Sequence, residues 1–180
     1  MPELRKDPVV GRWVIISTER SRRPTSFEPV PPVKQPSFCP FCPGQEDKTP
    51  PEVYALRPAD GRPNSPGWRV RVVPNKFPAL QIEGTLDRRG EGLYDKMNGV
   101  GAHEVVIETP EHAVDLADLP VEHLSQVLAA YRERIEDLHR DRRFECIPRG
   151  ADARHPVRSL DELHCNLVAL DLVVVAHAPR

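Results

Sequence analysis

Proline is the residue type that most limits how this chain can fold. Of its 180 residues, 21 are proline and only 10 are glycine. Each proline fixes its own φ, removes a backbone hydrogen-bond donor, and disfavours a helical conformation at the residue before it. Residues 25–51 are rich in proline and polar side chains, so they offer little apolar surface to bury. If this segment is ordered inside a domain it needs an additional constraint, and a bound metal ion is the obvious one.

The overall composition is that of a globular domain. Charged residues make up 29% of the chain and hydrophobic residues 39%, which is unlike a disordered segment. The net charge of −2 argues against a general nucleic-acid partner. No apolar run is long enough to cross a membrane, and the N-terminus lacks the apolar stretch of a secretory signal. We therefore expect one cytoplasmic domain over residues 1–180, with no membrane partner.

Hydrophobic periodicity predicts one long helix and several strands. Between Pro120 and His139 apolar residues recur at helical spacing, and the expected buried face comprises Leu124, Val127, Leu128, Tyr131, Ile135 and Leu138. Residues 83–101 and 145–158 are expected to form loops, the first of them exposed. Runs rich in β-branched or alternating apolar residues predict strands at 13–16, 69–74 (half-buried), 103–108 and 167–176. This combination predicts an α+β fold.

Cys39 and Cys42 form a C-x-x-C pair inside the proline-rich segment. Two thiolates at this spacing can bind one Zn²⁺, although a structural zinc site needs four ligands. His112 follows a Thr-Pro-Glu turn and is a candidate third ligand. The alternatives are a pair of free thiols and a solvated surface histidine.

Two further features could carry phosphate chemistry. Arg20, Arg22 and Arg23 form a basic turn whose guanidinium groups fit phosphate oxygens, although a solvated turn is the alternative. His164 stands at the head of the apolar run 167–176, where it could act as a nucleophile or a general base. The alternative for His164 is a partly buried structural histidine.

Four segments, in order, resemble the galactose-1-phosphate uridylyltransferase family. They are residues 5–24 (RKDPVVGRWVIISTERSRRP), 38–44 (FCPFCPG), 72–80 (VVPNKFPAL) and 101–112 (GAHEVVIETPEH). The resemblance implies a histidine-triad-like α+β fold, with an antiparallel sheet, a packed helix and a proline-rich loop pinned by zinc. A full member of the family has two such halves, and this chain is about as long as the first.

The resemblance also implies a reaction. A histidine attacks the α-phosphate of UDP-glucose, and galactose 1-phosphate then accepts the uridylyl group from that histidine. Carried over to this sequence, Cys39, Cys42 and His112 match zinc ligands, Arg20 and Arg23 match phosphate contacts, and Phe41, Asn75 and Phe77 match nucleoside contacts. A homodimer is also expected, because an apolar strand at 167–176 without a second half to cover it would leave a free edge.

The catalytic segment departs from the family pattern Ser-Leu-x-His-Pro-His-x-Gln. Residues 159–166 read SLDELHCN, which keeps His164 at the position of the nucleophile. Glu162 takes the place of the fourth zinc ligand, and Ser159 and Asn166 fall at positions that contact substrate. A carboxylate can bind zinc, so the metal site is compatible with this change.

The departure leaves several interpretations open. The chain is a diverged uridylyltransferase, a fragment whose reading frame is disturbed after Phe144, or a non-catalytic remnant that binds zinc and nucleotide. A related enzyme class, the ADP-sugar phosphorylases and adenylyltransferases, shares similar motifs. Comparing UDP-glucose with ADP-glucose as substrates distinguishes the two enzyme classes.

Overall fold

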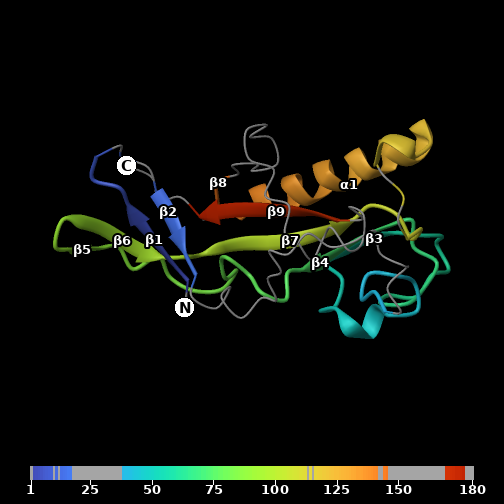
Figure 1. Cartoon of the computed structure of the whole chain (residues 1–180), viewed down its shortest axis with the longest axis horizontal. Coiled ribbons are helices and arrows are strands. Elements are labelled where there is room, and N and C mark those ends of the chain that lie inside the picture. Colours follow the sequence, from blue (N-terminus) through green and yellow to red (C-terminus); the bar gives the residue numbers. More distant parts are fainter. Residues whose placement is uncertain are drawn as a thin grey trace, which may run out of the picture.

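The computed structural model describes residues 2–9, 11, 13–17, 38–112, 114 and 116–141, together with the backbone of 144–145 and 169–176. These parts form two antiparallel sheets and one long helix, which confirms the α+β prediction (Figure 1). The likeness to a histidine-triad fold and the single-domain assignment stay predictions. The elements are β1 (Glu3–Lys6), β2 (Trp13–Ile16), η2 (Glu46–Lys48), β3 (Tyr54–Leu56), β4 (Val70–Pro74), β5 (Arg89–Glu91), β6 (Tyr94–Asn98), β7 (Gly101–Ile107), η3 (Leu116–Asp118), α1 (Val121–His139), β8 (Phe144–Glu145) and β9 (Ala169–Ala176).

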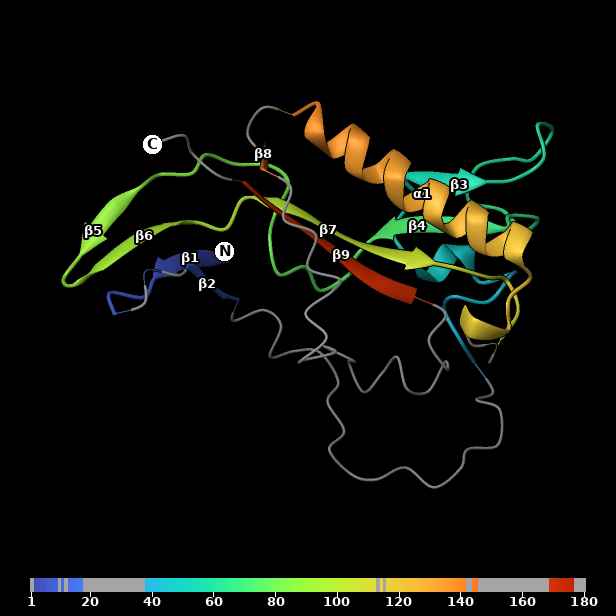
Figure 2. The same ribbon diagram turned by 90° about the horizontal axis from the view of Figure 1, so that it is seen from above.

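The larger sheet has the strand order β3-β4-β7-β9-β8, and α1 lies across one of its faces (Figures 1 and 2). On that face Val70 and Val72 of β4 and Val106 of β7 pack with Val127 and Ala130 of α1. Because side chains alternate along a strand, the intervening residues point to the opposite face. The central strands are therefore covered on both sides.

The opposite face carries a second core cluster. Val73, Val105 and Ile107 pack there with Cys39 and Trp68. The predicted strand at residues 69–74 is present as β4, but the prediction that it is half-buried is wrong, because Val70 to Val73 are all buried. Arg71 is only 1% exposed, because its guanidinium group is held inside the protein by Glu52 at 2.9 Å.

Helix α1 confirms the predicted helix, but its buried face differs from the prediction at one position. Leu128 is 62% exposed, because it lies one residue, or about 100° of helical rotation, beyond the buried Val127. Arg134 takes a place in the buried face instead, where its guanidinium group pairs with both carboxylate oxygens of Glu104 at 2.8 and 2.9 Å. A charged side chain can be buried there because its partner is buried with it.

Residues 83–101 were expected to be an exposed loop. Residues 83–95 are exposed apart from the partly buried Leu86, but the prediction of a loop is wrong for most of the segment after residue 88. The whole segment contains β5, β6 and the first residue of β7, and β5 and β6 form a hairpin that turns at Gly92. This hairpin joins β1 and β2 in the smaller sheet, whose order is β2-β1-β6-β5. Lys96 makes ion pairs with Glu3 and Glu91 at 2.8 and 3.0 Å, so charges that resemble a solvated loop belong to cross-strand pairs.

Strand β9 confirms the strand that was predicted at residues 167–176. Residues 169–175 of β9 pair with β7, while β8 pairs with Val175 and Ala176. Of the predicted loop at 145–158, Glu145 belongs to β8, and residues 146–158 lie outside the described residues. The homodimer remains a prediction. No helix in the described part of the chain is both long and apolar enough to cross a membrane.

Candidate metal centre

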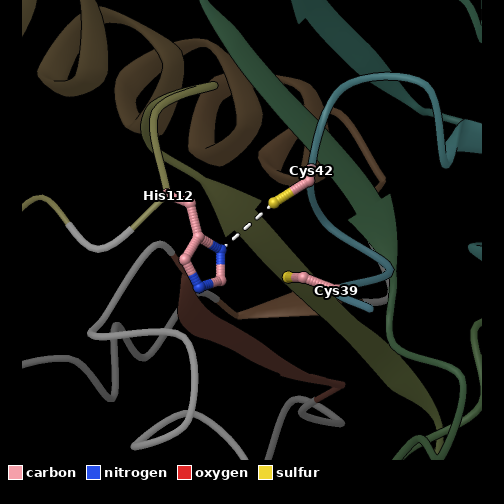
Figure 3. A group of neighbouring side chains, drawn as sticks. All are labelled: Cys39, Cys42 and His112. Carbon is pink, nitrogen blue, oxygen red and sulfur yellow. Dashed lines mark hydrogen bonds between the residues drawn. The ribbon is translucent and has the colours of Figure 1, made fainter. Parts of the chain in front are cut away.

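Three predicted metal ligands meet on the face of the larger sheet opposite α1. The ligand atoms of Cys39, Cys42 and His112 all lie within 4.8 Å of one another. The Sγ atom of Cys42 is 3.1 Å from Nδ1 of His112, and Figure 3 shows the imidazole ring turned toward both sulfur atoms. Residues 70 positions apart in sequence are therefore brought to one point.

Local backbone geometry explains why the two cysteines point the same way. The N–H of Cys42 donates to the carbonyl of Cys39 at 3.3 Å, and the N–H of Gln45 donates to the carbonyl of Cys42 at 3.1 Å. These consecutive turns fold residues 39–45 back on themselves. His112 arrives from the end of β7 through a turn in which the Thr109 hydroxyl accepts the N–H of Glu111 at 3.1 Å.

The donor set fits Zn²⁺. Zinc prefers thiolate and imidazole ligands, and tetrahedral zinc places its ligand atoms about 3.5–3.8 Å apart. The three donor atoms are already close to such spacing, with every separation under 4.8 Å. The fourth ligand predicted from the sequence, Glu162, lies outside the described residues.

The environment of the two cysteines also suits a role as metal ligands better than a role as nucleophiles. Burial raises the pKa of the Cys42 thiol to about 11, and the neighbouring Cys39 adds to the shift. A thiol with such a pKa stays protonated at neutral pH and is a poor nucleophile. A bound cation reverses this preference, because it stabilises two adjacent thiolates directly.

A polar network supports residues 39–45, which carry both cysteines and are called the metal loop below. Sequence analysis missed this network. The carboxylate of Glu46, 6% exposed, accepts the indole N–H of Trp68 and the backbone N–H of Gly44, both at 2.9 Å. Arg71 donates to the hydroxyl of Thr49 at 2.9 Å. No local pattern signals these contacts, because Glu46 and Trp68 are 22 residues apart and come together only through the fold.

Replacing Glu46 tests how much this network contributes. Glu46→Gln is expected to lower the free energy of unfolding by about 1–3 kcal/mol, because an amide has one acceptor oxygen and so can accept from only one of the two N–H donors. Urea unfolding of the chain measures the change. Asp47→Asn is the matched control: Asp47 is the exposed neighbour, and its replacement should change stability by less than about 0.5 kcal/mol. Equal effects in the two variants would contradict the assignment.

The predicted nucleoside-contacting residues lie on the same face as the metal ligands. Phe41, between the two cysteines, packs against the cluster formed by Val73 and Val105. Asn75 follows β4 two positions after Val73, so alternation places it on the same face. Phe77 is partly exposed in the turn that follows. The other predicted site residues lie outside the described residues: Arg20, Arg23, Ser159, Glu162, His164 and Asn166.

Comparison with known proteins identifies relatives over most of the chain. A family model for the N-terminal domain of galactose-1-phosphate uridyl transferase matches residues 1–148. An ADP-glucose phosphorylase of Arabidopsis thaliana is 36% identical over 181 residues, which cover 96% of this chain and 49% of that protein. A galactose-1-phosphate uridylyltransferase of Thermotoga maritima is 27% identical over 139 residues, which cover 77% of this chain and 36% of that protein.

A solved structure agrees with these matches. The crystal structure of an ADP-glucose phosphorylase from Arabidopsis thaliana with bound ADP-glucose has a TM-score of 0.55 and 34% sequence identity, and the match covers 99% of this chain and 50% of that one. The chain thus spans half the length, or less, of the relatives described here. Because the family model covers well over half of its residues, the chain belongs to the galactose-1-phosphate uridyl transferase family and corresponds to the N-terminal domain.

Proposed function

We propose that this chain takes part in nucleotidyl transfer from a nucleoside diphosphate sugar, with His164 as the nucleophile. The observation that carries the proposal is the family match over residues 1–148, joined with a Cys39–Cys42–His112 cluster that can hold zinc. The register of residues 159–166 with the family's catalytic pattern supports the choice of His164.

The proposed reaction has two steps. A ring nitrogen of neutral His164 attacks the α-phosphorus of the nucleotide sugar, forming a P–N bond while the bond from that phosphorus to the bridging oxygen breaks. The sugar 1-phosphate leaves with that bridging oxygen. In the second step an oxygen of the acceptor phosphate attacks the same phosphorus, the P–N bond breaks, and the histidine is regenerated.

The other proposed site residues serve binding. Arg20 and Arg23 balance the charge of the phosphates, since guanidinium groups pair with phosphate oxygens. Phe41, Asn75 and Phe77 contact the nucleoside, and Ser159 and Asn166 contact the phosphates. Cys39, Cys42, His112 and Glu162 would hold zinc, which would stabilise the fold around the site.

ADP-glucose is the substrate that the comparisons favour first. The ADP-glucose phosphorylase is 36% identical to this chain, whereas the uridylyltransferase of Thermotoga maritima is 27% identical. With ADP-glucose as donor and inorganic phosphate as acceptor, the products are glucose 1-phosphate and ADP. UDP-glucose with galactose 1-phosphate as acceptor is the second candidate, supported by the name of the matching family model.

Intact-protein mass spectrometry tests the proposal. Incubation of the zinc-loaded chain with ADP-glucose at neutral pH is expected to give a covalent adenylyl adduct, and UDP-glucose a smaller fraction of uridylyl adduct. His164→Ala should abolish both adducts, because the P–N bond then has no nitrogen to form on. His123→Ala is the matched control, since His123 bonds to the carbonyl of Glu108 at 2.7 Å and has no role in the proposed chemistry.

Two other outcomes would overturn parts of the proposal. A full adduct in His164→Ala would place the nucleophile elsewhere. A folded, zinc-loaded chain that binds nucleotide sugar without forming an adduct would instead support a non-catalytic binding domain. Adding a separately made C-terminal half from a relative would then show whether the second half of the family's architecture is needed for the first step.

A further inference from the structure

One buried residue forms hydrogen bonds with both ends of the turn that follows β4. The segment from Asn75 to Ala79 contains Pro78, which has no backbone donor, so few hydrogen bonds can fix its shape. His103 of β7, 4% exposed, supplies an acceptor to both ends of the segment. Its carbonyl accepts the N–H of Asn75 at 2.9 Å, and its ring atom Nδ1 accepts the N–H of Ala79 at 2.8 Å.

The same imidazole borders the side chain of Asn75. Its Nε2 atom lies 3.2 Å from Nδ2 of Asn75, while Oδ1 of Asn75 accepts the N–H of Phe77 at 2.8 Å. Because Nδ1 accepts from Ala79, the proton of the neutral ring is on Nε2, so its approach to Nδ2 brings two donors together and is not a hydrogen bond. The carboxamide is held through the N–H of Phe77. These contacts leave Lys76 exposed and the side chains of Asn75 and Phe77 partly accessible.

The chemistry of histidine suits this position. Because a backbone N–H can only donate, Nδ1 of His103 must be an acceptor, which requires the neutral ring. A buried acceptor at this point satisfies the Ala79 amide, which is itself buried and would otherwise lose a hydrogen bond. An apolar residue of similar size would fill the space and leave that donor without its acceptor.

We propose that His103 is a positioning residue for nucleotide binding: it sets the shape of the Asn75–Ala79 turn, which carries the side chains of Asn75 and Phe77. This inference rests on the proposed function, in which Asn75 and Phe77 contact the nucleoside. His103 itself touches no substrate in this scheme. Its effect is transmitted through the turn, and a displacement of about 1 Å in a binding group is enough to change affinity or rate strongly.

The experiment compares two replacements of His103 by two readouts. His103→Ala removes the acceptor for Ala79, whereas His103→Asn keeps an oxygen close to the former position of Nδ1. Hydrogen exchange of the Ala79 amide, followed by NMR, is expected to be about tenfold faster in His103→Ala and within about threefold of the unmodified chain in His103→Asn. Calorimetric affinity for ADP-glucose is expected to fall about tenfold in His103→Ala and to be largely recovered in His103→Asn.

Val127→Ala controls for a general loss of stability, because Val127 packs between α1 and the sheet on the face away from the turn. It should lower stability without changing the Ala79 exchange rate or the affinity for ADP-glucose. The inference is overturned if His103→Ala leaves both readouts within twofold of the unmodified chain, or if Val127→Ala reproduces its effects. If the unmodified chain binds neither ADP-glucose nor UDP-glucose, the proposed function fails, while Ala79 exchange still decides whether His103 holds the turn.

Discussion

Replacing either cysteine of the metal centre, as Cys39→Ser or Cys42→Ser, is expected to lower zinc affinity by a factor of about 100 or more. A serine hydroxyl stays protonated at neutral pH and is a weak zinc ligand, so one of the three described donors is lost. A competition titration with a chromogenic chelator measures the affinity. Consider zinc at about 1,000 times the dissociation constant of the unmodified chain. It should then raise the free energy of unfolding of the unmodified chain by about 4 kcal/mol. For a variant that binds zinc about 100-fold more weakly, the gain should be only about 1.4 kcal/mol.

Cys146→Ser is the control for non-specific binding by thiols, because Cys146 was not predicted to bind the metal. Its affinity should match that of the unmodified chain, and Glu162→Gln should show an intermediate loss if Glu162 supplies the fourth ligand. Zinc binding that survives in Cys39→Ser would show that the cluster is not the metal site. The metal loop should remain near its place without zinc, because the contacts of Glu46 with Trp68 and Gly44 do not involve the ligand atoms.

The two cysteines of the candidate metal centre were predictable because the C-x-x-C spacing is local. His112 was assigned with them through the resemblance of residues 101–112 to the family. Strands β2, β4, β7 and β9 and helix α1 were predicted from local patterns as well. In each case the hydrophobic pattern of a few consecutive residues is sufficient.

What sequence analysis missed depends on distant partners. The hairpin of β5 and β6 is short and charged, and it becomes part of a sheet only because β6 pairs with β1, about 90 residues earlier in the chain. Arginine is usually exposed, so the sequence gives no sign that Arg71 and Arg134 are buried. In the fold, Glu52 pairs with Arg71, and Glu104 of β7 pairs with Arg134 of α1. Such ion pairs leave no periodic trace in the sequence.

The role of His103 was hidden for a related reason. Within its strand it is one more residue between apolar neighbours, and nothing local distinguishes it from a structural core histidine. Its partners, Asn75 and Ala79, follow a different strand, and the antiparallel register of β4 and β7 brings them opposite His103. A prediction of that register would have been the only way to find it.

Two buried glutamates, Glu104 in the middle of β7 and Glu108 just after its end, are expected to respond in opposite ways to replacement by glutamine. Glu104 and Glu108 are 3% exposed each. Glu104 pairs through both carboxylate oxygens with Arg134, whereas the described partner of the Glu108 carboxylate is the hydroxyl of Tyr131 at 3.2 Å. Among the described residues, a cation compensates the charge of Glu104, whereas the carboxyl group of Glu108 accepts from a neutral donor.

The environment of Glu108 makes the stability of the protein depend on pH. Burial raises the pKa of Glu108 from 4.5 to about 7, and the hydrogen bond from Tyr131 opposes the shift only in part. Between these two values the folded chain holds the proton while the unfolded chain has released it. The contribution of Glu108 to the free energy of unfolding therefore falls as pH rises through this window, by about 3 kcal/mol in total.

Glu108→Gln is expected to raise the free energy of unfolding by as much as about 3 kcal/mol at pH 8 and by little near pH 4, because the amide carries no charge at either pH and can still accept from Tyr131. Glu104→Gln should lower stability at pH 8 by about 3 kcal/mol, because it leaves the buried guanidinium group of Arg134 with the exposed Asp137, at 2.7 Å, as its described counter-charge. Urea unfolding at both pH values measures these differences. Glu111→Gln, at an exposed position on the same segment, should change stability by less than about 0.5 kcal/mol. If Glu108→Gln gives no greater gain at pH 8 than at pH 4, then Glu108 ionises in the folded chain as readily as in the unfolded one, and burial is not what governs its charge.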